Sequence, residues 1–295
     1  MSYSISAALT HAAKKIITVT DVPQLEAEIL LSHVLNVTRV YLHTWPEKLI
    51  DTTQQIQFDN LISKRAAGEP IAYLVGHREF WSLNLIVTPD VLIPRSDTEL
   101  LVEKVLETIK SDSAVIADLG TGSGAIALAL AKEKPNWIIY AIDKSKAALD
   151  IAQLNAKELG LSNIRFSHGH WFDALPTIKY DAIVSNPPYI AEDDTHLLQG
   201  DLRFEPRMAL VSAKMGLQDL AEIILEAKYS LKSGGILFVE HGFQQAKNVL
   251  SFFKKEGYTS THVYQDLGKL DRVTMGTWLD FDIGNRPKTV TNGRV

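Results

Sequence analysis

The sequence predicts an α/β fold: a doubly wound, mostly parallel sheet with an antiparallel terminal hairpin, preceded by a small N-terminal helical domain. Three observations support this prediction. From about residue 90, short continuous apolar runs alternate with helical patterns, which is typical of a parallel sheet covered on both faces. The last two strands, near 259–264 and 272–278, have only seven residues between them, too few for a crossover helix, so they should pair antiparallel. Residues 1–68 show helical periodicity and no long alternating strand.

The first 69 residues are predicted to form a helical bundle. Three stretches carry apolar residues at helical spacing. Asp51 followed by Gln54 is typical of a capping box at the start of the third helix, and Gly68 ends that helix. The apolar positions are Ile5, Ala8, Leu9, Ala12, Ala13, Ile16 and Ile17, then Ala27, Leu30, Leu31, Val34 and Leu35, then Phe58, Leu61, Ile62 and Ala66.

Residues 70–89 are predicted to form a linker hairpin, with apolar residues at 73–75 and 80–87 on either side of a turn at 76–79. The main domain is expected to span 90–280. Its strands are expected at 114–119, 137–142, 164–167, 181–185 and 236–239, and its first helices at 125–132 and 144–159. The polar, aperiodic residues 281–295 are expected to be a loose tail.

The composition narrows the class of protein. The chain has 295 residues, of which 46% are apolar, enough for a sizeable core. A net charge of −5 argues against binding naked duplex nucleic acid. The absence of cysteine excludes disulfides, thiolate metal sites and a cysteine nucleophile. No signal peptide and no run of 18 apolar residues is visible, so we expect a soluble cytoplasmic protein.

A glycine-rich loop, residues 118–124, follows the first strand of the main domain. Its glycines allow the backbone to turn sharply and to approach a ligand closely. Asp143 ends the next strand, 19 residues after Gly124, and a carboxylate at about this distance reaches the ribose hydroxyls of an adenosine ligand. With Ala125 as its last position, the loop also fits the dinucleotide-binding pattern Gly-x-Gly-x-x-Ala. The loop alone therefore leaves both NAD and S-adenosylmethionine (SAM) open.

Two features favour SAM. The carboxylate of Asp118 would repel a pyrophosphate and attract the cationic methionyl end of SAM. No P-loop lysine follows the glycines, which argues against a nucleoside triphosphate. Trp171 follows the third strand, where an aromatic side chain can stack on adenine or, with nearly equal weight, fill the core.

The sharpest signal is Asn186-Pro187-Pro188-Tyr189, directly after the strand predicted at 181–185. The prolines end the strand and stiffen the turn, and ligands of such sheets bind beyond the carboxyl ends of the strands. An NH2 group on an amide or nucleobase is planar and a poor nucleophile. The Asn186 side-chain oxygen and the Pro187 carbonyl can accept its two N–H bonds and aim the nitrogen at the SAM methyl group, while Tyr189 stacks on the planar acceptor. The alternative is a rigid turn in which Asn186 bonds its own backbone.

On these residues the sequence resembles the HemK-type glutamine N5-methyltransferases of peptide chain release factors, over nearly the whole chain to about Trp278. The resemblance implies the SAM-methyltransferase variant of the doubly wound sheet. It implies methylation of the glutamine in the Gly-Gly-Gln loop of release factors, with the helical N-terminal domain helping to engage them. The matching segments are 93–99 (Ile-Pro-Arg-Ser-Asp-Thr-Glu), the glycine loop, Asp143, 171–173, 186–190, 204–206 with 209–210, 240–242 and 271–273.

The resemblance also implies roles for single residues, and two groups result when it is combined with the motifs. Asn186, Pro187, Pro188 and Tyr189 are predicted to bind the substrate, and Asn186, Pro187 and Tyr189 among them to be catalytic. The residues predicted to bind SAM are Asp118, Gly120, Thr121, Gly122, Ser123, Gly124, Asp143, Trp171 and Asn186.

Other matching residues have open roles. Arg95 can approach the cleft or pair with a carboxylate, and Glu205 can shape the acceptor pocket or only turn the chain. A lone His241 is more often structural, and no ligand spacing predicts a metal. Residues 96–99 are also typical of a capping box.

The main alternative is a methyltransferase for the exocyclic amine of adenine or guanine in nucleic acid, which poses the same chemical problem. The additional domain is helical and the net charge of the chain is negative, so we place the nucleic-acid methyltransferase second. A non-catalytic binding module is disfavoured by Asp118, Asp143 and Asn186, and an NAD oxidoreductase by the lack of an acid–base residue after the turn. We expect SAM as cofactor, class I release factors as partners, a monomer, and no membrane or direct nucleic-acid contact.

Overall fold

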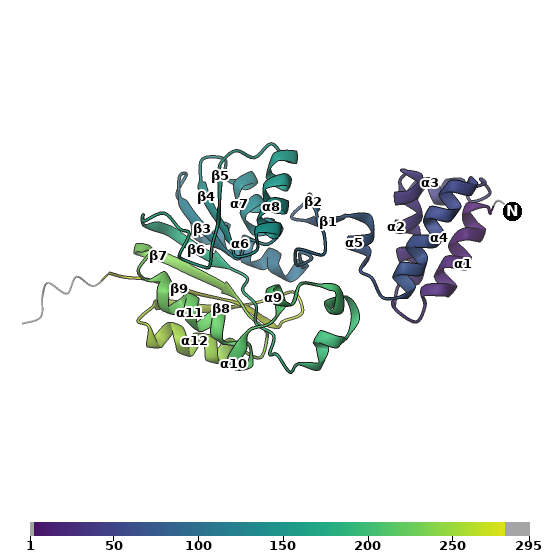
Figure 1. The fold of residues 1–295 in the computed structure, drawn as a ribbon. Coiled ribbons are helices and arrows are strands. Elements are labelled where there is room, and N and C mark those ends of the chain that lie inside the picture. Colours follow the sequence, from purple (N-terminus) through teal and green to yellow (C-terminus); the bar gives the residue numbers. More distant parts are fainter. Residues whose placement is uncertain (1–2, 281–295) are drawn as a thin grey trace, which may run out of the picture.

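The structure, a computed structural model, describes residues 3–280. It consists of a small helical bundle and a larger α/β domain, joined by a short helix and a hairpin (Figure 1). The tail expected at 281–295 lies outside the described residues.

The bundle contains α1 (Ile5–Ile16), α2 (Pro23–Leu35), α3 (Arg39–Thr44) and α4 (Thr52–Ala66). The apolar stripes of α1, α2 and α4 meet in one buried cluster. The capping box expected at Asp51 and Gln54 is present at the start of α4. The six-residue α3 was not predicted, because a helix of fewer than two turns shows no periodic stripe.

The linker differs from the prediction in its turn. It contains α5 (Ile71–Val75), β1 (His77–Phe80) and β2 (Leu83–Ile86), and the two strands pair antiparallel. Gly76, at φ +77°, ends α5, so the turn predicted at 76–79 is wrong, and residues 73–75 are helical. The hairpin turns instead at Trp81 and Ser82, which both have positive φ. Neither residue carries the Asn-Gly or Asp-Gly signal by which such a two-residue turn is usually found.

The main domain is built on a seven-stranded sheet of order β5-β4-β3-β6-β7-β9-β8. The first five strands along the chain run parallel, and the last two form the expected antiparallel hairpin at one edge. The predicted fold class is therefore confirmed. The strands are β3 (Val115–Leu119), β4 (Ile138–Asp143), β5 (Ile164–His168), β6 (Tyr180–Ser185), β7 (Leu231–Glu240), β8 (Thr259–Gln265) and β9 (Asp271–Thr277).

Helices cover both faces of this sheet (Figure 1). One face packs against α6 (Glu99–Thr108), α7 (Ala125–Glu133) and α8 (Lys146–Glu158), and the other against α11 (Gln218–Ala227) and α12 (Ala246–Lys255). Alternate residues of β3 point to opposite faces of the sheet. Ile116 packs in the core on the α7 side, and Ala117 and Leu119 pack in the core on the α11 side. None of the helices in residues 3–280 combines the length and apolar character needed to span a membrane.

The chain reverses its order in the sheet between β3 and β6. After β3 it adds β4 and β5 on one side, and it then returns to place β6 on the other side of β3. Leu119 and Ser185 end these strands in register, and the Ser185 hydroxyl donates to the Leu119 carbonyl at 2.7 Å. Such a switch point is where open α/β sheets bind ligands.

Candidate active site

A cavity of about 300 Å³ lies at the carboxyl ends of β3, β4 and β6. Its volume is within the range of small-molecule sites. Of the residues predicted to bind cofactor or substrate, its wall includes Gly120, Thr121, Gly122, Ser123, Asp143, Trp171, Asn186 and Pro188. The wall as described does not include Asp118, Gly124, Pro187 or Tyr189. The structure thus brings the glycine loop and the Asn186 turn to one cavity.

The glycine loop needs its glycines. Gly120, Gly122 and Gly124 all have positive φ, between 57° and 88°, which is strained for other residues. A Cβ on Gly120 would lie 3.0 Å from the Trp171 ring, and one on Gly124 would lie 2.8 Å from Leu128. A Cβ on Gly122 would meet nothing within 4 Å, so this part of the loop leaves space for a ligand.

Asp143 connects the loop to the end of β4. Its Oδ2 accepts from the Gly122 N–H at 2.8 Å and its Oδ1 accepts from the Ser145 N–H at 2.8 Å. Burial raises the pKa of Asp143, and these two bonds act in the opposite direction. Each oxygen keeps a further lone pair, so the carboxylate can hold the loop and still accept from ligand hydroxyls at the cavity wall.

Asp118 lies beneath the loop. It is fully buried, and its Oδ2 accepts from the Thr121 hydroxyl at 2.6 Å and from the Ala127 N–H at 3.2 Å. Burial raises the pKa of this carboxyl to about 7. We therefore propose that Asp118 shapes the glycine loop from below; a direct contact with the cofactor remains a prediction.

Trp171 packs in the core, one of the two roles that its sequence position left open, and stacking on adenine remains a prediction. Its ring packs in the core cluster with β3 and α11, and the residue also lines the cavity. Its backbone has φ +40°, and its buried indole N–H has no partner among the described residues. An aromatic wall beside the glycine loop suits the flat face of an adenine.

Asn186 is oriented by Thr98. The Asn186 Nδ2 group donates to the Thr98 hydroxyl oxygen at 3.1 Å. Within residues 3–280 no donor is bonded to Asn186 Oδ1 or to the Pro187 carbonyl. Both of these acceptors, which follow the carboxyl end of β6, are therefore without a donor among the described residues.

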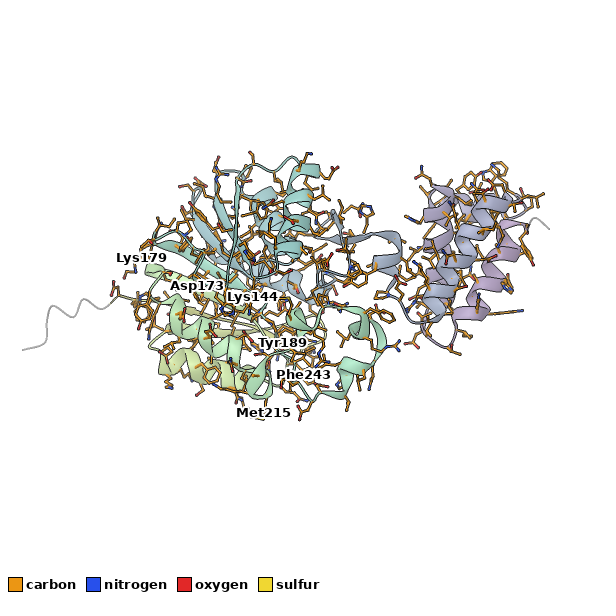
Figure 2. The ribbon with its side chains drawn as sticks, in the orientation of Figure 1. Lys144, Asp173, Lys179, Tyr189, Met215 and Phe243 are labelled. Carbon is orange, nitrogen blue, oxygen red and sulfur yellow. The ribbon has the colours of Figure 1, made fainter. Side chains whose placement is uncertain are left out.

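The ring of Tyr189 packs against the core cluster on the α12 side of the sheet, where Figure 2 labels it. Its hydroxyl donates to Glu240 Oε1 at 3.3 Å, and burial raises its pKa. The Tyr189 carbonyl accepts from Gln245 Nε2 at 3.0 Å. A stacking role for Tyr189 remains a prediction, because the ring is not part of the described cavity wall.

Arg95 and Glu205, whose roles were open, form an ion pair with each other. Glu205 has a buried side chain, and it also accepts from the Ile93 N–H at 3.3 Å. Burial raises the pKa of Glu205, and Arg95 opposes that shift. Arg95 lines the cavity, as does Pro206, which follows Glu205. The pair therefore joins two segments of the cavity wall.

His241 is structural. One ring nitrogen bonds the Thr274 hydroxyl at 2.8 Å and the other bonds the Gly242 carbonyl at 3.0 Å, and burial lowers the pKa of the ring. In the part of the chain that the structure covers, no three His, Cys, Asp or Glu side chains gather as a metal site.

The sequence did not identify three residues that shape this site: Thr98, Glu240 and Asn155. The capping box proposed for residues 96–99 is not formed; Ser96–Thr98 is a 3₁₀ turn (η1), and the Glu99 carboxylate accepts from the Trp81 N–H. The matching segments 93–99 and 240–242 contained Thr98 and Glu240, but their contacts join residues distant in the sequence.

Comparisons with known proteins agree with this geometry. Residues 7–76 match the family described as PrmC N-terminal domain, and residues 96–201 match the Methyltransferase small domain. The release factor glutamine methyltransferase of Aliivibrio fischeri is 46% identical over 281 residues, covering 95% of this chain and 99% of that protein. That of Coxiella burnetii is 47% identical over 271 residues, covering 92% and 97%. The crystal structure of a methyltransferase from Pyrococcus furiosus shares the fold, with a TM-score of 0.53 at 18% identity over 75% of this chain and 99% of that one.

The sheet, the glycine loop and the cavity define a SAM-dependent methyltransferase. The residues present fit that cofactor, because a glycine loop open at Gly122, a carboxylate at the end of β4 and an aromatic wall meet in one cavity. The sequence identity to the two relatives extends over almost their whole length, and it identifies the family more closely than the fold does. The chain belongs to the release factor glutamine methyltransferases.

Proposed function

We propose that the chain transfers a methyl group from SAM to the side-chain nitrogen, N5, of the glutamine in the Gly-Gly-Gln loop of class I peptide chain release factors. SAM supplies an electrophilic methyl group on a sulfonium. The observation that carries the proposal is the pair of available acceptors at Asn186 and Pro187, beside a cavity whose other wall is the glycine loop. The relatives named above are called release factor glutamine methyltransferases, which supports glutamine in a release factor as the acceptor.

The two acceptors match the chemistry of a primary amide. Asn186 Oδ1 and the Pro187 carbonyl would each take one N–H of the glutamine, which fixes the plane of the amide and the direction of the nitrogen lone pair. As positive charge builds on nitrogen, both N–H bonds become stronger donors, so the same oxygens stabilise the transition state more than the ground state.

The helical bundle is proposed to dock the release factor. Its last helix touches the loop that follows the acceptor turn: Arg65 on α4 lies 3.5 Å from Asp201 on η3 (Gly200–Phe204). A Cβ on Gly68 would meet the guanidinium end of Arg203, so the end of the bundle lies close to η3 here as well. The chain then continues from η3 to Met208 and Ala209 on the cavity wall. A protein held by the bundle would therefore be held near the cavity.

We also propose that the chain acts as a monomer in the cytoplasm, without a membrane and without direct contact to nucleic acid. The net charge of −5 supports the last of these points.

The test is methyl transfer from labelled SAM to purified release factor, followed by mass mapping of the product. We expect one methyl group on the glutamine of the Gly-Gly-Gln loop, and no label when this glutamine is replaced by alanine. Label found only in added nucleic acid, with none in the release factor, would overturn the proposal in favour of an exocyclic-amine methyltransferase.

A further inference from the structure

A buried carboxylate lies behind the acceptor turn. Glu240 is the last residue of β7 and is 1% exposed. Its Oε1 accepts from the Tyr189 hydroxyl, while no donor within residues 3–280 reaches its Oε2 with full hydrogen-bond geometry. Burial raises the pKa of Glu240 to about 7, and the neighbouring Thr98 hydroxyl, which is also buried, lowers it. The cavity wall includes neither Glu240 nor Tyr189, but it includes Thr98.

The hydrogen bond between Thr98 and Asn186 has a required direction. The Asn186 Nδ2 group can only donate, so the Thr98 oxygen must accept, and the hydroxyl hydrogen must point to another acceptor. Glu240 Oε2 is a buried acceptor without a donor among the described residues, so it is suited to take that hydrogen. If the hydroxyl hydrogen turned toward Asn186 instead, the amide would gain by flipping, and its NH2 group would then face the cavity.

From this arrangement we infer that Glu240 and Thr98 are positioning residues: the carboxylate holds the Thr98 hydroxyl hydrogen, the Thr98 oxygen holds the Asn186 NH2 group, and Asn186 Oδ1 is thereby turned to the substrate. The inference rests on the proposed function, because it concerns the same acceptor. Through Tyr189, Glu240 also holds the other end of the four-residue turn, so one carboxylate holds both ends.

The charges around Glu240 have defined partners of their own. Arg272 attracts the carboxylate, but Arg272 itself pairs with Asp266 at 2.8 Å and with Asp97 at 3.2 Å. Asp97 repels it. Arg272 therefore stabilises the negative charge of Glu240 from a distance. The two side chains do not form an ion pair of the kind that Arg272 forms with Asp266 and Asp97.

The first experiment compares two substitutions of one side chain. Thr98→Val keeps the shape and removes the hydroxyl, whereas Thr98→Ser keeps the hydroxyl. Turnover of release factor and SAM affinity by calorimetry are measured for both. We expect Thr98→Val to lower kcat on the order of tenfold, since one oriented bond is lost, with a SAM Kd within about twofold of wild type, and Thr98→Ser to retain most of kcat. Equal activity of the two variants would overturn the inference.

The second experiment needs no methyl acceptor. The side-chain NH2 signals of Asn186 are assigned by ¹⁵N NMR, using their loss in Asn186→Asp. We expect their hydrogen exchange to accelerate in Thr98→Val and in Glu240→Gln, and to stay slow in Thr98→Ser. Unchanged exchange in Glu240→Gln would remove the carboxylate from the relay. Wild-type protein that leaves release factor unmethylated, but shows these exchange changes, would overturn the proposed function and leave the relay supported. If Thr98→Val does not fold, Glu240→Gln carries both measurements.

Discussion

Asn155 on α8 bonds both backbone groups of Ile86 on β2: its Oδ1 accepts from the Ile86 N–H at 2.7 Å, and its Nδ2 donates to the Ile86 carbonyl at 3.0 Å. The same Nδ2 group donates to the Ser123 carbonyl at 3.0 Å. Asn155 therefore acts as a strand partner for the free edge of β2 and ties the linker hairpin to the glycine loop.

Asn155→Leu should lower the free energy of unfolding by about 3 kcal/mol, because buried backbone groups on β2 and on the glycine loop lose their partner. It should also weaken SAM binding through the loosened loop. Urea unfolding and calorimetry measure the two effects. Leu154→Ala, at a more exposed position of the same helix, is the control and should change both much less. Equal losses in the two variants would contradict the proposed tie.

Asp143→Ala should raise the Kd for SAM at least tenfold. The carboxylate would accept from the ligand, and bonds to charged groups contribute about 1.5–3 kcal/mol. The substitution also frees the Gly122 N–H that Asp143 now holds. Calorimetry measures the Kd, with Asp150→Ala on the solvent side of α8 as the matched loss of a carboxylate. A normal Kd in Asp143→Ala would remove this residue from the cofactor site.

Asn186→Ala should abolish most turnover while sparing SAM affinity much more. The lost acceptor acts chiefly in the transition state, where one oriented partner contributes roughly 3 kcal/mol, about a hundredfold in kcat. Single-turnover rates with release factor give the first quantity and calorimetry the second. Wild-type rates in this variant would refute the role of Asn186.

The pH dependence of stability should change in Asp118→Asn. In the folded chain burial raises the pKa of Asp118 from 3.8 to about 7, so between these values the folded state binds more protons than the unfolded state. Stability from this group is then present at low pH and is lost as pH rises from about 4 to 7. Urea titrations at several pH values should show a shallower decline in Asp118→Asn than in wild type, with Glu240 contributing equally to both. Identical slopes would contradict burial of an ionisable Asp118.

Removal of residues 1–68 should impair methylation of release factor far more than SAM binding, because the cavity residues named above all lie beyond position 90. Asp201→Ala, which only breaks the contact between α4 and η3, should fall between wild type and the truncated chain. Both rates are compared with the SAM Kd of the same preparation. Full activity of the truncated chain on release factor would contradict a docking role for the bundle.

The sheet, the helical bundle and both loops at the cavity could be predicted from the sequence, because each depends on neighbours along the chain. Glycines 120–124 and Asn186 with its prolines follow apolar strands directly, and parallel strands bring their carboxyl ends to one edge. The turn at Trp81 and Ser82 was missed because neither residue has an intrinsic preference for positive φ.

The roles of Thr98, Glu240 and Asn155 could not be predicted, because each depends on tertiary contacts. Thr98 meets Asn186 across 88 positions, and Asn155 meets Ile86 across 69. The attraction of Asp118 for the cationic end of SAM stays a prediction. Its bond to the Thr121 hydroxyl within the loop could not be predicted, because a sequence shows the charge of a residue but not its contacts.

The register of Leu119 with Ser185 has a consequence for how substrates can vary. Adjacent strands are held roughly 4.8 Å apart by their backbone ladder, so the glycine loop and the Asn186 turn, which follow these strands, keep a fixed separation. The separation of the two segments is thus set by the sheet itself. Selectivity can be altered in the stretch after the turn, from 195 to 203, which lies before Glu205 and the cavity-wall residues that follow it.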